Sequence, residues 1–335
     1  MDAEPRRRGH DLSRVDPRHL DLLRELADRG SVTAVAEATH RTPSAVSQQL
    51  RTAQRDLGGI PLVEPHGRGV RLTEAGLLLA DGGRDLARAV AQVQAGWDAY
   101  LGSASGTVRL AALPSAATIL LPAVLDRLRE TAVNLECTDV DIAESEYSGM
   151  VADHDIVVGH SFTGPVPAGA GRLVTAGLLR EPLDIAMRSD HALAAKARVT
   201  ARDVALHEWY GVPLGYPFDD LRIAVETAAG TPIRVVQRLR DNRLIEALVA
   251  ASDRVAVLPR YSTTPGAGLT LRPVHGMDAA RWIVAILRPD RAERLAVRTV
   301  LDALRATARD VVGLDATTGR HPVPATSDRR HTRYV

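Results

Sequence analysis

The sequence has a single cysteine and no long apolar run. Because Cys137 is the only cysteine among 335 residues, no disulfide forms within one subunit, and a two-cysteine redox switch in one subunit is excluded. Cys137 alternates with Val133 and Leu135, so we expect it to be buried on a strand rather than to act as a sensing thiol. No apolar stretch approaches the length of a membrane span, and we expect no signal peptide. These features predict a cytoplasmic protein without membrane contact.

The sequence also lacks a strong net charge and the common catalytic motifs. Its formal charge is +1, so any attraction to DNA must come from local arginines. The eleven histidines show no HExxH spacing, and neither a Gly-rich phosphate loop nor a GxSxG elbow is present. An acidic run has the mixed spacing of an exposed loop or strand edge; it comprises Asp139, Asp141, Glu144 and Glu146. We therefore predict that the protein has no metal site and no cofactor, and that it is not an enzyme.

Residues 42–58 have the pattern of a short capped helix. Thr42 is a good N-cap, Pro43 suits the first helical position, and Gly58 follows the last apolar residue as a stop. This predicts a helix over residues 43–57. One face of it is apolar and predicts burial, and its members are Val46, Leu50, Ala53 and Leu57.

The opposite face of this helix is polar and suited to DNA. Its members are Ser44, Ser47, Gln48, Arg51 and Arg55. Serine, glutamine and arginine side chains reach base edges and phosphates when a helix lies in the major groove. For an isolated helix, an ordinary solvated face is the alternative, and the neighbouring segments decide between the two.

The upstream segments predict the rest of a helix-turn-helix. A first helix is expected over residues 17–29, with Gly30 as its C-terminal stop, and a second over residues 32–40, capped by Ser31. The second helix is rich in alanine, which lets the following helix pack closely and steeply against it.

The downstream segment predicts a wing. Two short strands, residues 62–64 and 70–72, flank a Gly-rich turn. Arg68 lies at the tip of this turn and Arg71 at its base. We expect both arginines to lie near the DNA backbone or the minor groove.

At this point the chain resembles the N-terminal winged helix-turn-helix of LysR-type transcriptional regulators. The matching residues are Gly30-Ser31, Ala36, Ala45-Val46-Ser47, Leu57-Gly58, Pro61-Leu62, Gly67-Arg68-Gly69-Val70-Arg71-Leu72-Thr73 and Ala75-Gly76. The resemblance implies an all-α winged helix-turn-helix over residues 15–73 that binds double-stranded DNA. The candidate DNA-binding residues are Thr42, Pro43, Ser44, Ser47, Gln48, Arg51, Arg68 and Arg71.

A long helix is expected over residues 74–102, capped by Thr73. Its apolar residues follow a heptad pattern and comprise Leu79, Leu86, Val90, Val93, Trp97 and Tyr100. Gly82 and Gly83 interrupt it, so we expect a bend or a close approach there. The stripe favours pairing with a second copy over packing on its own domain. The resemblance likewise implies dimerisation through this linker helix, giving a homodimer or homotetramer on two-fold related half-sites.

Beyond a small-residue hinge at 102–106, strands and helices alternate and end in a closing helix expected over residues 292–312, which predicts an α/β domain of two lobes. This region resembles the effector-binding domain of the same family, which is similar to periplasmic binding proteins. The supporting residues are Leu120-Leu121-Pro122, Asp155 to Gly159, Glu181-Pro182-Leu183, His191 to Ala194, and Leu248 to Ala251 running into Val257-Leu258-Pro259. We expect this domain over residues 106–312, with lobe I at about 106–163 and 268–312 and lobe II at about 164–267.

A small-molecule effector is expected between the lobes, where helix N-termini favour an anion. The candidate effector-binding residues are Ser115, Ala116, His160, Tyr216, Phe218 and Asn242. Ser115 and Ala116 open a helix and match a position at which relatives hold effectors, His160 follows a strand, and Asn242 is expected to cap a helix. Each residue also has an ordinary structural interpretation, as a helix cap, a hinge residue or part of a lobe core.

The sequence thus predicts a sequence-specific DNA-binding transcriptional regulator controlled by a small molecule. The alternatives are an architectural DNA-binding protein without effector, or an enzyme fused to a DNA-binding domain. RNA polymerase is a further candidate partner. Residues 1–13 and 314–335 lack apolar periodicity, and we expect both tails to be disordered.

Overall fold

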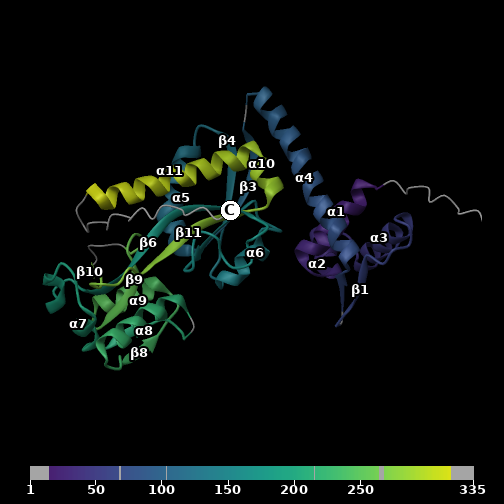
Figure 1. Ribbon diagram of the computed structural model, residues 1–335. Helices are drawn as coiled ribbons and strands as arrows, with labels where there is room; N and C mark the ends of the chain where they lie inside the picture. The colour runs from purple at the N-terminus through teal and green to yellow at the C-terminus, as the bar shows by residue number, and fades with distance from the viewer. Residues whose placement is uncertain (1–14, 68, 103, 215, 264–267, 318–335) are drawn as a thin grey trace, which may run out of the picture.

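The computed structural model describes residues 15–67, 69–102, 104–214, 216–263 and 268–317 (Figure 1). Its N-terminal part, which we call the head, is a helix-turn-helix followed by a β-hairpin. The head consists of α1 (Pro17–Arg29), α2 (Val32–Ala38), α3 (Pro43–Asp56), β1 (Val63–His66) and β2 (Gly69–Leu72). These bounds confirm the predicted helices and strands to within two residues at most ends. Arg68 and residues 1–14 and 318–335 lie outside the described residues, whereas residues 314–317, expected to be disordered, form the end of helix α11 (Leu295–Thr317).

The caps predicted from the sequence fix the ends of the head helices. The Ser31 and Thr42 side chains accept hydrogen bonds from backbone N–H groups in the first turns of α2 and α3. Gly30 ends α1 in the left-handed conformation, with φ 74°. His40, in the turn after α2, also adopts the left-handed conformation, with φ 53°. The N–H of Arg41 then donates back to the carbonyl of Ala36 at 2.8 Å. This turn sets the angle at which α3 follows α2.

Helix α4 (Glu74–Tyr100) connects the head to the rest of the chain (Figure 1). It packs on α1 at Gly83, where a Cβ atom would lie 2.6 Å from the carbonyl oxygen of Leu20. Gly82, beside it, has nothing within 4 Å of such an atom. The glycine pair therefore marks a close helix approach at one of its two positions.

The remainder is an α/β domain built on a nine-stranded sheet in the order β4-β3-β5-β11-β6-β9-β7-β8, with β10 paired to β6. Its strands are β3 (Ser105–Ala112), β4 (Ala132–Asp139), β5 (Ile156–Ser161), β6 (Val174–Arg188), β7 (Trp209–Gly211), β8 (Val235–Arg238), β9 (Val255–Pro259), β10 (Leu269–Arg272) and β11 (Ala280–Leu287). Its helices are α5 (Pro114–Leu128), α6 (Tyr147–Met150), α7 (Ala201–Ala205), α8 (Pro217–Ala229), α9 (Asn242–Ala250), α10 (Pro289–Glu293) and α11 (Leu295–Thr317), with 3₁₀ turns at Glu144–Glu146 and Ala192–Ala195.

The sheet belongs to two lobes, each with a core on both faces. In lobe I, α5 and α11 bury one face of β3, β5 and β11, and α6 covers the other. In lobe II, α8 packs on one face of β6 and β9 and α9 on the other. Successive buried residues of β5 and β11 belong alternately to the two cores of lobe I, as the two-residue repeat of a strand requires.

Strand β6 joins the lobes. Residues 174–182 pair with β11 in lobe I, whereas residues 183–188 pair with β9 and β10 in lobe II. The lobe boundaries predicted from the sequence, at about residues 163 and 268, lie instead before β6 and before β10. A strand that continues from one lobe into the next has no turn residues to mark the crossing.

Three expectations from the sequence are wrong in detail. Cys137 is exposed, because β4 is the edge strand of the sheet. The closing helix expected over 292–312 is two helices, since Arg294 is extended and its guanidinium bonds Asp155 and the carbonyl of Thr107. Asn242 is not a cap: the Asp241 side chain caps α9 by accepting from two backbone N–H groups. No helix in the described ranges has both the length and the apolar character that a membrane span needs.

Candidate functional site

The exposed face of α3 carries the residues predicted to contact DNA. Val46, Leu50 and Ala53 are buried in the head core, at 0 to 4% exposure, so the helix has one face turned inward. On the other side, Gln48 and Arg51 are exposed. The Arg51 guanidinium donates to the amide oxygen of Gln48 at 2.8 Å. The pair presents amide and guanidinium N–H donors together, as base-edge recognition requires.

The start of α3 adds a hydroxyl cluster. Thr42 accepts from the N–H of Ala45 at 3.2 Å, and its hydroxyl lies 2.9 Å from that of Ser44. Thr42, Pro43 and Ser44 are exposed, and Ser47 is partly buried. Free N–H groups at a helix N-terminus favour phosphate, so this end of α3 is suited to contact a phosphate of the DNA backbone.

The wing contributes one described arginine. Arg71 of β2 faces Glu64 of β1 across the hairpin, and its Nε donates to the Glu64 carboxylate at 2.6 Å. Both side chains are exposed, so the pair is screened by solvent and weak. A DNA phosphate would compete with Glu64 for this guanidinium.

In the α/β domain, a buried ion pair lies where the two lobes join. Arg281 of β11 donates to Glu181 of β6, at 2.8 Å from Nε and 2.6 Å from Nη2. The two side chains are 3% and 0% exposed. The second carboxylate oxygen of Glu181 accepts the N–H groups of Tyr261 and Ser262. These bonds compensate two charges that would otherwise be costly to bury.

Arg281 is the point at which several predicted effector residues meet. Its Nη2 donates to the Ser115 hydroxyl at 2.9 Å, and its guanidinium carbon lies 5.5 Å from the ring centre of Phe218. Ser115 belongs to lobe I and Phe218 to α8 of lobe II, so Arg281 connects both lobes. Ser262 lies 3.3 Å from the same nitrogen.

His160 joins this cluster through aromatic contacts. Its Nδ1 lies 3.0 Å from the Tyr147 hydroxyl, and its ring packs edge-on against Phe162, which in turn contacts Phe218. Burial, with Arg281 nearby, lowers the pKa of His160 to about 4. Burial also raises the pKa of Tyr147. His160 is therefore a neutral imidazole at pH 7.

The other predicted effector residues lie apart from this cluster. Ala116 is fully buried in the lobe I core. Tyr216 packs in lobe II, with the guanidinium of Arg240 over its ring at 5.3 Å. Asn242 occupies the first turn of α9 beside its cap Asp241. Ser115, His160 and Phe218 are thus brought together, and the other three are not.

Sequence reasoning missed Arg281, Glu181, Tyr147 and Phe162. A charge at the start of an apolar strand was the available signal for Arg281, which precedes Trp282-Ile283-Val284. Its partner Glu181 lies 100 residues away, in the neighbouring strand of the sheet. The two charged residues come together only because β11 pairs with β6.

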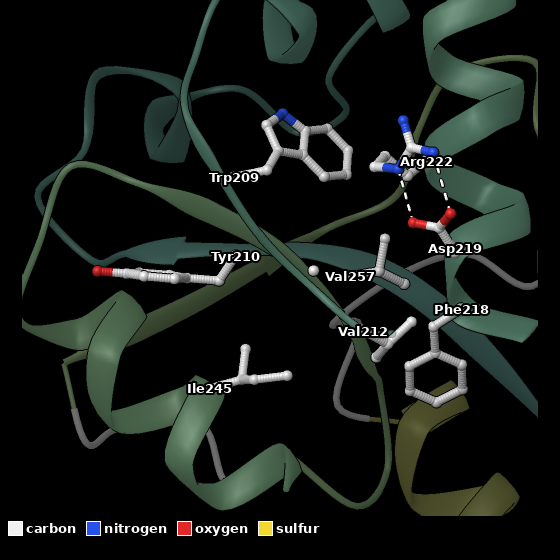
Figure 2. A pocket seen from close by; sticks show the side chains of 9 residues that line it. Trp209, Tyr210, Val212, Phe218, Asp219, Arg222, Ile245 and Val257 are labelled. Carbon is white, nitrogen blue, oxygen red and sulfur yellow. Dashed lines mark hydrogen bonds and ion pairs between the residues drawn. The ribbon is translucent and has the colours of Figure 1, made fainter. Parts of the chain in front are cut away.

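A small void lies inside lobe II (Figure 2). It measures about 10 Å³ and is lined by residues that include Trp209, Tyr210 and Phe218. Asp219 and Arg222 face each other at its edge, with an ion pair of 2.6 Å (Figure 2). This volume holds about one water molecule, so the void is a packing feature of the lobe and not a ligand site.

Two family models match the chain and together cover both parts of the fold. The model of the bacterial regulatory helix-turn-helix protein, lysR family, matches residues 17–77. The model of the LysR substrate binding domain matches residues 101–309, more than half of the chain.

Curated relatives match over most of their length. A hydrogen peroxide-inducible genes activator from Pectobacterium carotovorum is 24% identical over 291 residues, covering 86% of this chain and 95% of that protein. The transcriptional dual regulator GltC from Bacillus subtilis is 25% identical over 285 residues, covering 83% and 92%.

Solved structures share the fold. A hydrogen-peroxide-bound OxyR mutant from Corynebacterium glutamicum superposes with a TM-score of 0.53 at 20% identity, covering 91% of this chain and 96% of that chain. Full-length OxyR from Pseudomonas aeruginosa, also a mutant, gives 0.53 at 19% identity, covering 87% and 98%.

Proposed function

Because this chain belongs to the LysR family of bacterial transcriptional regulators, we propose that α3 reads a specific operator and that a small molecule between the lobes controls this binding. The family consists of regulators and not of enzymes, which removes the enzyme alternative. The match to a substrate-binding domain over residues 101–309 likewise removes an architectural protein without effector. The division of the chain into residues 15–73, 74–102 and 106–312 remains our proposal for its domains.

The observation that carries the DNA-binding proposal is the two-sided character of α3. Its apolar stripe is buried, while Gln48 and Arg51 share the exposed face and bond to each other. We assign base reading to these two residues and to Ser44 and Ser47. Phosphate contacts fall to Thr42 at the helix start and to Arg68 and Arg71 of the wing, while Pro43 helps to present the first turn of α3 to the major groove.

The apolar residues of α4 support a dimer. Five of them form an exposed stripe, with exposures between 37 and 80%: Leu86, Val90, Val93, Trp97 and Tyr100. The Trp97 and Tyr100 rings stack, with centroids 5.5 Å apart. A stripe of this size on a monomer marks an association surface. A second copy paired along α4 would place two heads on two-fold related half-sites.

The Ser115–Arg281 contact supports an effector with an anionic oxygen. The Ser115 hydroxyl and the Arg281 guanidinium are joined at the start of α5, where the helix dipole also favours negative charge. His160 and Phe218 add a neutral imidazole and an aromatic edge to the same region. We therefore propose a small carboxylate that bonds Ser115 and Arg281.

Peroxide sensing by an intramolecular disulfide does not apply to this chain, although some relatives carry names that refer to peroxide. Cys137 is its only cysteine. Partial desolvation of its sulfur, with Asp139 nearby, raises the pKa of the Cys137 thiol although the residue is exposed, which disfavours the reactive thiolate. The effector must act without a pair of cysteines in one subunit.

A selection experiment tests the DNA-binding proposal. The protein would be incubated with a pool of random duplex DNA at fixed salt, and the bound fraction sequenced over successive rounds. We expect a two-fold symmetric consensus with half-sites about one helical turn apart. A bound pool without any consensus would contradict sequence-specific reading by α3.

A thermal-shift screen tests the effector proposal. Small carboxylates would be screened for stabilisation, and hits repeated on Ser115→Ala and Thr118→Ala. Thr118 lies about one turn further along α5 and donates to the carbonyl of Pro114 at 2.9 Å, so it is the matched hydroxyl control. A true effector at 100 times its Kd stabilises the native state by about 2.7 kcal/mol. Loss of the stabilisation in Ser115→Ala but not in Thr118→Ala supports an effector site at Ser115. Equal stabilisation of both variants contradicts it.

A further inference from the structure

A cavity of about 240 Å³ lies between the head, α4 and lobe I, apart from the cluster around Arg281. Asp28 of α1 and Arg84 of α4 line one side of it. Ser148 of α6, Arg172 of the segment before β6, and Arg288 before α10 line the other. Any ligand here would touch the DNA-binding part and the effector domain at once.

Arginine side chains dominate the charged groups of the lining. It holds three guanidinium groups and one carboxylate, that of Asp28, while the carboxylates of Asp81, Asp290 and Glu25 lie beside these arginines. Arg84 bonds Asp28 at 2.6 Å and Asp81 at 2.5 Å. Arg288, only 6% exposed, is held by Asp290 at 2.9 Å and lies 3.7 Å from Asp28. Two of the three arginines are therefore fixed in place by the fold.

Arg172 is the least engaged of the three. Its side chain is 72% exposed, and among the described residues its one ion pair is to the half-exposed Asp81, at 3.3 Å. An exposed pair at this distance contributes little and yields readily to a stronger partner. Arg172 thus has donor groups available to an incoming anion, beside the two arginines already in position.

We propose that this cavity binds a small multivalent oxyanion, one that carries phosphate or clustered carboxylate groups. Guanidinium groups form planar, paired hydrogen bonds with such oxyanions. The volume is below that of pockets for drug-sized ligands, which restricts the ligand to a compact anion. The Ser148 hydroxyl supplies one neutral partner.

Such an anion would hold the head against lobe I. Ion pairs already join the two parts, including Arg29 with Asp153 at 2.7 Å and Arg24 with Asp290 at 3.5 Å. A ligand that requires both parts to form its site stabilises their docked arrangement by mass action. The site therefore gives the regulator a second input, separate from the interlobe effector.

Isothermal titration calorimetry of the full chain with sodium pyrophosphate tests this proposal. Ionic strength is held constant with sodium chloride, so that general screening is the same throughout. The variants are Arg172→Ala, with Arg129→Ala as the matched control. Arg129 is 77% exposed and also has one exposed acidic partner, Asp126. A third variant, Arg51→Ala, monitors pyrophosphate bound at the DNA-binding face.

We expect one pyrophosphate per chain for the wild type, Arg129→Ala and Arg51→Ala. Arg172→Ala should bind about 10-fold more weakly or worse, as the loss of a charge-assisted contact implies. Its unfolding temperature without anion should match the wild type, because the side chain is exposed. Absence of wild-type binding, or equal binding by Arg172→Ala, would overturn the proposal, as would loss of binding in Arg51→Ala.

Discussion

The hydroxyl oxygen of Ser115 accepts a 2.9 Å hydrogen bond from Nη2 of Arg281, the same nitrogen that lies 2.6 Å from the Glu181 carboxylate. Lobe I, the strand that joins the lobes and the ring of Phe218 therefore meet at one guanidinium. Nε and Nη2 of Arg281 thus already donate to protein acceptors. An effector oxygen bound through these two nitrogens would have to compete with Ser115 and Glu181.

Glu181→Gln should destabilise the α/β domain by about 3–5 kcal/mol, because it leaves the buried Arg281 without a counter-charge. Glu136→Gln is the control, because Glu136 is exposed and its ion pair with Arg109 is long, at 3.6 Å. This change should cost less than about 1 kcal/mol. Urea unfolding followed by tryptophan fluorescence measures both, and equal midpoints would contradict the role given to the Arg281–Glu181 pair.

Alanine substitutions of the two adjacent glycines in α4 should change stability in opposite directions. Gly83→Ala places a methyl group against the Leu20 carbonyl and should destabilise the packing of α4 on α1 by about 1–3 kcal/mol. Gly82→Ala meets open space and should stabilise the helix by up to about 1 kcal/mol. Hydrogen exchange of α1 peptides reports this packing. Faster exchange in both variants would show that α4 does not approach α1 as described.

Stability should fall as pH drops from about 6.5 toward 4 because of His160. Its folded pKa of about 4 lies below the value of 6.5 for a free imidazole. In this window the unfolded chain binds more protons, so acid favours unfolding, by at most about 1.4 kcal/mol per pH unit. His160→Asn should flatten the profile, whereas His66→Asn in the exposed wing should keep it. An unchanged slope in His160→Asn would refute this assignment.

Val93→Glu should weaken the dimer by about 10-fold or more, because it buries a charge in the proposed α4 interface. Val93 is 76% exposed in the single chain. Leu206→Glu is the control, at a residue that is 81% exposed in lobe II. Sedimentation equilibrium over a range of concentrations measures both. Dissociation in Leu206→Glu, or none in Val93→Glu, would argue against pairing along α4.

Gln48→Ala should relax sequence choice more than it weakens binding, by about 1–3 kcal/mol of discrimination at the base it reads. Gln237→Ala, at the exposed residue of the edge strand β8, should change neither property. Titrations of the selected operator and of single-base variants, at one salt concentration, measure the difference. If Gln48→Ala keeps full discrimination, another residue reads that base.

The head could be predicted closely from the sequence because its signals are local. Thr42, Thr73 and Gly30 act within one turn of the helices they begin or end, and the stripe through Val46 and Leu50 needs only helical spacing. The interlobe cluster could not be predicted in the same way. Arg281 and Glu181 meet through strand pairing, and β6 crosses between lobes without a turn. Cys137 was placed wrongly because alternation does not reveal which strand forms the edge of a sheet.

Footprinting on the DNA upstream of the protein's own gene tests directly whether α3 recognises a specific operator. The wild type and Arg51→Ala would be compared at the same stated salt, with Arg129→Ala as an arginine control remote from the head. We expect a discrete two-fold protected site for the wild type and Arg129→Ala, and its loss in Arg51→Ala. Uniform, salt-sensitive coating by all three proteins, or no protection at all, would contradict sequence-specific recognition by α3.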